Sequence, residues 1–134
     1  MRSKQKVLRW KRHAALMVAT IHRTQADLIA DVGEPAVVVL AACDQLDQSI
    51  ADLRRWMLDH PSPEPELDLC LSSLVRACSG LGTMMTTVAR LAPAGIDTEV
   101  HHLPASFAQY MEGQVDALAD AWAEVRRLEL VGPS

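Results

Sequence analysis

Apolar residues in this chain recur at alternating steps of three and four, and this spacing restricts the fold more than any other feature. The stripes run from Val7 to Leu28, from Ala36 to Met57, from Leu67 to Val88 and from Val100 to Leu128. Steps of three and four place side chains on one face of an α-helix, whereas a half-buried strand would alternate with a period of two. No segment keeps a period of two throughout. The sequence therefore predicts an all-α fold.

Proline and glycine interrupt the pattern within 31–35, 60–65 and 92–95. Both residue types end helices, because proline lacks a backbone N–H and glycine favours the left-handed conformation that follows a helix. The interruptions predict helices near 4–30, 35–59, 65–92 and 104–129. Pro35 and Pro104 would begin two of them, and 96–103 would form a turn or a separate short helix.

The connections between these helices are short, and short connections make neighbouring helices antiparallel. We therefore expect an antiparallel up-down-up-down four-helix bundle. The chain has 134 residues, of which 49% are apolar and 4% aromatic. This length and composition fit a single domain over 1–134 with an aliphatic core.

Positive charge is concentrated at the N-terminus. Residues 1–26 contain seven basic residues and no acidic one, while 27–134 contain six basic and seventeen acidic residues. We interpret 1–12 as a basic arm continuous with the first helix. Such an arm is either a solvated helix face or a docking surface for an anionic partner.

An up-down-up-down bundle would bring 1–13, 53–68 and 118–134 to one pole. This pole would hold ten basic and seven acidic residues and, at similar heights, Trp10, Trp56 and Trp122. Phosphates need positive charge and bases need flat aromatic faces, so the combination is typical of a nucleic-acid or anion site. Tryptophans that close the core beneath long arginine side chains would give the same pattern. The candidate binding residues are Lys4, Lys6, Arg9, Lys11, Arg12, Arg54, Arg55, Arg126 and Arg127.

The chain has three cysteines, Cys43, Cys70 and Cys78, at spacings that match no disulfide framework or metal motif. We expect buried free thiols in a reducing compartment, and hence a cytoplasmic protein. The apolar run over 14–21 is too short to span a membrane, and no small-residue cleavage site follows it. No transmembrane segment is predicted.

Motifs for catalysis and for metal or cofactor binding are missing from the sequence. The histidines do not form a ligand set, because His13 and His22 are nine residues apart and would face opposite sides of one helix. Gly80 and Gly82 lie inside the third helical pattern and indicate a close helix–helix contact rather than a phosphate loop. We predict no catalytic residue, no metal site and no cofactor.

One enzymatic alternative is retained from the spacing of arginine and histidine. Arg54 and Arg55 precede His60 by six and five residues, which matches the arginine–histidine spacing of HEPN ribonucleases. Composition alone gives about one such match by chance. An HEPN-like ribonuclease is therefore only a remote alternative.

We expect a non-enzymatic, soluble helical-bundle interaction module that binds a protein partner or itself, most simply as a homodimer. The expectation depends on apolar residues that lie outside the core stripes, namely Val38, Leu40, Leu58 and Leu69. The alternative is a protein that binds DNA or RNA through the basic, tryptophan-containing pole and the N-terminal arm.

Overall fold

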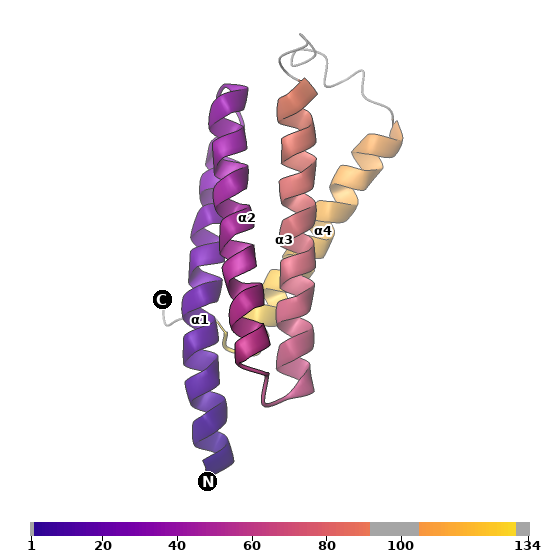
Figure 1. Ribbon diagram of the computed structural model, residues 1–134. Coiled ribbons are helices and arrows are strands. Elements are labelled where there is room, and N and C mark those ends of the chain that lie inside the picture. Colours follow the sequence, from indigo (N-terminus) through magenta and orange to yellow (C-terminus); the bar gives the residue numbers. More distant parts are fainter. Residues whose placement is uncertain (1, 92–104, 131–134) are drawn as a thin grey trace.

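The computed structural model describes residues 2–91 and 105–130, and within these ranges the side chains of 2, 3 and 105–108 are not described. Four helices follow one another along the chain: α1 (Arg2–Ala30), α2 (Ala36–Asp59), α3 (Pro65–Leu91) and α4 (Ala105–Arg127). The predicted helices agree with these bounds to within two residues at every end. The all-α prediction is confirmed, and the packing is that of a four-helix bundle (Figure 1). The predicted segment 96–103 lies outside the described residues.

Pro35 is predicted to be the first residue of the second helix. In the structure α2 begins one residue later, at Ala36. Pro35 is the N-cap of α2, and its carbonyl accepts the N–H groups of Val38 and Val39. At the other end of α2, the N–H of His60 donates to the carbonyl of Trp56. Proline suits the start of a helix because its missing N–H would have no intrahelical partner there.

The end of α4 is closed by a motif that the sequence did not reveal. The N–H of Leu130 donates to the carbonyl of Val125, and the N–H of Glu129 donates to that of Arg126. Glu129 has a φ of 58°, in the left-handed region that glycine usually occupies after a helix. Leu130 and Val125 are both fully buried, so this Schellman turn ties the end of α4 to the core.

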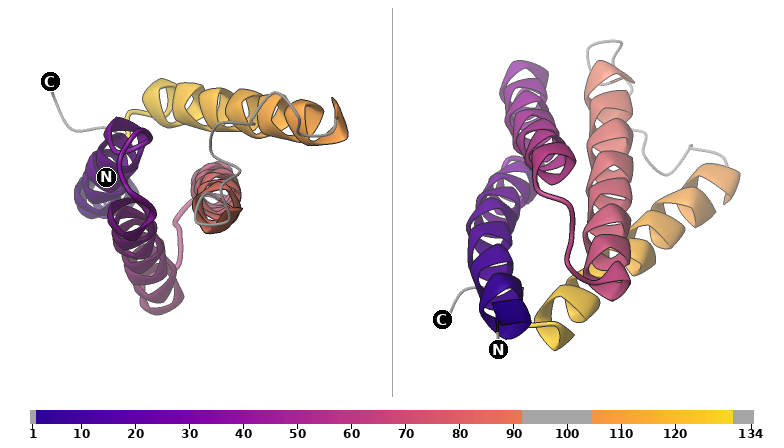
Figure 2. Two further views of the ribbon diagram at one scale, coloured as in Figure 1. Left: turned by 90° about the horizontal axis from the view of Figure 1, so that it is seen from above. Right: turned by 60° about the horizontal axis from the view of Figure 1, so that its bottom comes forward.

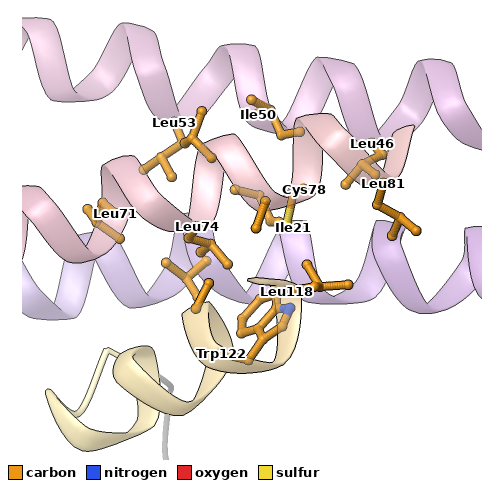
Figure 3. Close-up of a cluster of buried hydrophobic side chains, with 14 of the residues drawn as sticks. Ile21, Leu46, Ile50, Leu53, Leu71, Leu74, Cys78, Leu81, Leu118 and Trp122 are labelled. Carbon is orange, nitrogen blue, oxygen red and sulfur yellow. The ribbon is translucent and has the colours of Figure 1, made fainter. Parts of the chain in front are cut away.

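Each helix packs mainly against its neighbours in the chain: α1 on α2, α2 on α3 and α3 on α4. Large side chains from all four helices meet in one core (Figure 3). The fully buried ones include Ile21, Leu46, Leu53, Leu71, Leu74 and Val125. The helices are therefore held together chiefly by aliphatic burial, as the apolar stripes predict.

The fourth helix departs from a regular bundle. It crosses α3 obliquely, and its N-terminal end turns away from the other helices (Figures 1 and 2). From residue 109 onward, where its side chains are described, the first buried residue is Leu118, while Tyr110 and Val115 are exposed. All four helices thus contribute to the core near the C-terminal half of α4, whereas the N-terminal half of α4 contributes less to it.

At Gly80 the backbone of α3 lies close to a side chain of α4. A Cβ atom at Gly80 would lie 1.9 Å from the side-chain oxygen Oε1 of Gln114. Gly82 is buried beside Leu46 and Asp47 of α2. The prediction that this glycine pair marks a close helix–helix contact is confirmed.

All three cysteines are buried free thiols, as predicted. Burial raises the pKa of the Cys78 thiol to about 12. Burial, with a smaller contribution from Glu124, raises the pKa of Cys70 to about 11. None of the described helices is both long enough and apolar enough to cross a membrane.

Candidate interaction surfaces

The basic N-terminal arm extends beyond the rest of the bundle. The indole N–H of Trp10 donates to the carbonyl of His60, 2.9 Å away, which aligns Trp10 with the end of α2. Residues 2–9 therefore project past that end by about 12 Å, at 1.5 Å per residue (Figure 1). Lys6 and Arg9 lie about 60° apart on one side of this projecting helix, and Lys4 lies on the other side.

The cations of this arm face solvent. Lys4, Lys6, Arg9 and Arg12 are exposed, and Lys11 is half-buried. None of them forms an ion pair with any residue that the structure describes. Five of the nine candidate binding residues thus remain available to an anionic partner.

The other four candidate cations differ in availability. Arg127 forms ion pairs with Glu124 and Glu66, so its charge is already compensated. These contacts lower the pKa of Glu124, chiefly through the hydrogen bond from Arg127. Arg55 lies 3.9 Å from Asp52. Only Arg54 and Arg126 are exposed and without an ion pair among the described residues.

An imidazole–indole cluster, made of Trp10, His13, Trp56 and His60, lies at the root of the arm. The rings of His13 and His60 stack on Trp56 with centroid separations of 4.9 and 5.1 Å. The two imidazole centroids are 6.1 Å apart. Rings on opposite faces of an indole would be about 7 Å apart, twice the carbon contact distance, so both imidazoles lie on the same face of Trp56.

The expected meeting of three tryptophans at the basic pole is wrong for Trp122. Trp10 and Trp56 do meet, with ring centroids 5.2 Å apart. Trp122 instead donates its indole N–H to Oε1 of Gln25 at 2.5 Å. Gln25 lies fifteen residues beyond Trp10 on α1, or about 22 Å along the helix axis. The side chain of Trp122 points back toward the start of α4, as helical side chains do, and so reaches the middle of the bundle (Figure 3).

A second candidate surface lies at the opposite end of α1. An open groove of about 600 Å³ runs between α1 and α2. Its lining is mainly apolar and carries two carboxylates: Asp27, Ala30, Asp31, Val37, Val38, Ala41, Ala42 and Gln45. The sequence had singled out only Val38 in this groove, although the mixture of valines and aspartates outside the apolar stripe was visible over 27–38.

The other apolar residues that the sequence placed outside the core stripes differ in exposure. Leu58 and Leu69 are exposed, at 82% and 67%. Leu40 is half-buried and packs against the core, although it lies outside the predicted apolar stripe.

The structure places His60 of the arginine–histidine spacing in the imidazole–indole cluster. Its Nδ1 lies 3.0 Å from the carbonyl oxygen of Trp56, four residues earlier. Within 2–91 and 105–130, no group of three or more histidine, cysteine, aspartate or glutamate side chains is arranged to hold a metal ion.

No protein-family model matches the chain, and comparisons with curated proteins and with solved structures found no match.

Proposed function

We propose that this protein is a non-enzymatic interaction module that associates with a second copy of itself. One observation supports this proposal above the others. Among the described residues, six of the ten large apolar side chains that are exposed lie on α1, on the turn after it or at the start of α2. They are Leu8, Leu16, Ile29, Val32, Val37 and Val38.

Single exposed apolar residues are common on protein surfaces, but their concentration along one helix and the turn that follows it indicates a contact surface. Leu16 is the clearest case, because 69% of it is exposed in the middle of a long helix. The helix α1 packs on α2 on one side, and none of the other described helices lies over its outward face (Figure 2). We call this side of the molecule, with the six residues above, the α1 surface.

Sedimentation equilibrium at protein concentrations of about 1 to 100 μM tests the proposal. We expect a mass that rises with concentration from the 14.7 kDa of the monomer toward twice that value. Leu16→Asp should weaken association, while Leu58→Asp, at a similarly exposed leucine outside the α1 surface, should leave it unchanged. A strict monomer over the whole range would contradict the proposal.

A second candidate function, binding of DNA or RNA, is favoured by the projecting arm with its uncompensated cations. Each phosphate that a cation neutralises contributes about −0.9 to the slope of log affinity against log salt on duplex DNA. Lys4→Gln/Lys6→Gln should therefore make that slope shallower by about 2, and Arg90→Gln, at an exposed cation far from the arm, should not change it. Equal slopes for all three proteins would exclude the arm as the binding site.

We also place the protein in the cytoplasm, because its three cysteines are free thiols.

A further inference from the structure

The charges of α1 oppose the dipole of the helix. Its N-terminal half carries Lys4, Lys6, Arg9, Lys11 and Arg12, and no acidic residue occurs in its first turn. Its last turn contains Asp27 and no basic residue, and Asp31 follows directly. Helices are stabilised by acidic residues at the N-terminus and basic residues at the C-terminus, so this layout weakens α1 by itself. A helix with such a layout gains most from a neighbour whose charges run the other way.

A second copy of α1 in the antiparallel direction supplies that neighbour. We propose that the groove between α1 and α2 binds the basic arm of a second copy, and that the two copies exchange arms reciprocally in a two-fold dimer. The inference rests on the proposed self-association and assigns its surface. The interaction is that of an amphipathic helix in an apolar groove.

The chemistry of the arm matches that of the groove. The arm presents Leu8 between exposed cations, and Leu8 itself is 53% exposed. The groove presents Val37 and Val38 beside the carboxylates of Asp27 and Asp31. Val37 is 74% exposed, which leaves apolar area for a leucine to cover.

The register of the two copies follows from the positions of the charges along α1. The midpoint between Arg12 and Asp27 in the sequence lies between residues 19 and 20, and the midpoint between Arg9 and Asp31 is residue 20. A two-fold axis beside Thr20 therefore brings both pairs together at once. The same axis places Leu8 beside Val32 of the second copy. One symmetry operation thus satisfies the charged and the apolar residues at both ends, as an isologous interface requires.

The charges that would pair in this register also lie on one side of α1. Arg9 and Asp27 are eighteen residues apart, which is five full turns, so they lie on the same side of α1. Arg12 is about 60° from both of them. Near the proposed axis, Leu16 and Arg23 lie within about 40° of Arg9 on this side of α1. Both are exposed, so Leu16 offers apolar area that the second copy can cover.

Charge reversal on one surface at a time tests the inference. One variant carries Arg9→Glu/Arg12→Glu, and the other carries Asp27→Lys/Asp31→Lys. In either variant the arm of one copy meets a groove of like charge, so we expect the dissociation constant of each homodimer to rise at least about 100-fold. In an equimolar mixture the glutamates meet the lysines and the native arginines meet the native aspartates, so a heterodimer should form with near wild-type affinity.

Neither variant adds a charge that opposes the dipole at the ends of α1, so we expect folded monomers, checked by circular dichroism. Arg9→Gln/Arg12→Gln provides a second measure, and its dimer should lose most of its dependence on NaCl. Homodimers of wild-type affinity from both reversed variants would overturn the inference and leave the proposed self-association standing. Failure of the mixture to associate would also overturn it. A monomeric wild-type chain would overturn the proposed function itself.

Discussion

The two indole N–H groups of Trp56 and Trp122 are equally inaccessible but differ in hydrogen bonding, and this difference gives a sharp test of the core. Both residues are less than 10% exposed. Trp122 donates to Gln25, whereas the buried Nε1 atom of Trp56 has no hydrogen-bond partner among the residues that the structure describes. Replacing each tryptophan with phenylalanine removes a similar volume, but only Trp122→Phe removes a hydrogen bond.

We expect Trp122→Phe to destabilise the fold substantially more than Trp56→Phe. In Trp122→Phe the buried oxygen of Gln25 keeps only a weak contact with the thiol of Cys78, at 3.8 Å. An acceptor left without a partner in a core costs about 1–3 kcal/mol. Trp56→Phe removes a donor that already lacks a partner, which offsets part of the lost ring packing. The two variants should therefore differ by about 2 kcal/mol in the free energy of unfolding.

Urea unfolding followed by far-ultraviolet circular dichroism measures both variants with a probe that does not depend on tryptophan. The dependence of stability on urea should be the same in both, so that midpoints can be compared. Gln25→Leu provides a control: with the acceptor gone, Trp122→Phe should cost less than it does in the wild-type background. Equal losses for Trp122→Phe and Trp56→Phe would refute the reasoning.

Three further predictions concern glycines, the end of α4 and the thiols. Gly113→Ala should stabilise the protein by up to about 1 kcal/mol, because Gly113 is exposed inside α4 with no atom near its missing Cβ; calorimetry showing no increase in melting temperature would contradict this. Glu129→Gly should also stabilise it, by about 1 kcal/mol, because Glu129 has a positive φ; loss of stability in urea would show that its side chain matters more than its backbone. The buried thiol of Cys78 holds its proton more tightly in the folded state, so its contribution is complete below about pH 9 and is lost as the pH rises toward about 12. Unfolding in urea at pH 8 and pH 10.5 should therefore show a smaller loss of stability for Cys78→Ala than for the wild type, and equal losses would exclude this cause.

Helix number and bounds were predictable from the sequence because they depend on local physics. The period of the apolar residues identifies a helix, and Pro35 and the prolines around Pro63 mark where helices stop. The contact at Gly80 was predictable for the same reason, since a glycine inside a helix usually has a packing role. The end of α4 was less visible, because Glu129 occupies a position where glycine would be expected.

The content of the candidate surfaces was only partly predictable. The charge of the arm is a property of composition, so Lys4 and Arg12 could be assigned to it directly. Whether a given cation is already paired depends on a residue far away in the sequence. Arg127 is compensated by Glu66, sixty-one residues earlier, and no local pattern indicates that contact.

The sequence by itself determined the four helices, their order and the uneven charge along α1, since all of these follow from spacing, turn residues and composition. Only the tertiary structure decided the angle at which α4 crosses α3. That angle sends Trp122 to Gln25 and leaves Trp10 and Trp56 with the two histidines at the pole. The crossing depends on how side chains fit between helices, and such a fit depends on residues far apart in the chain.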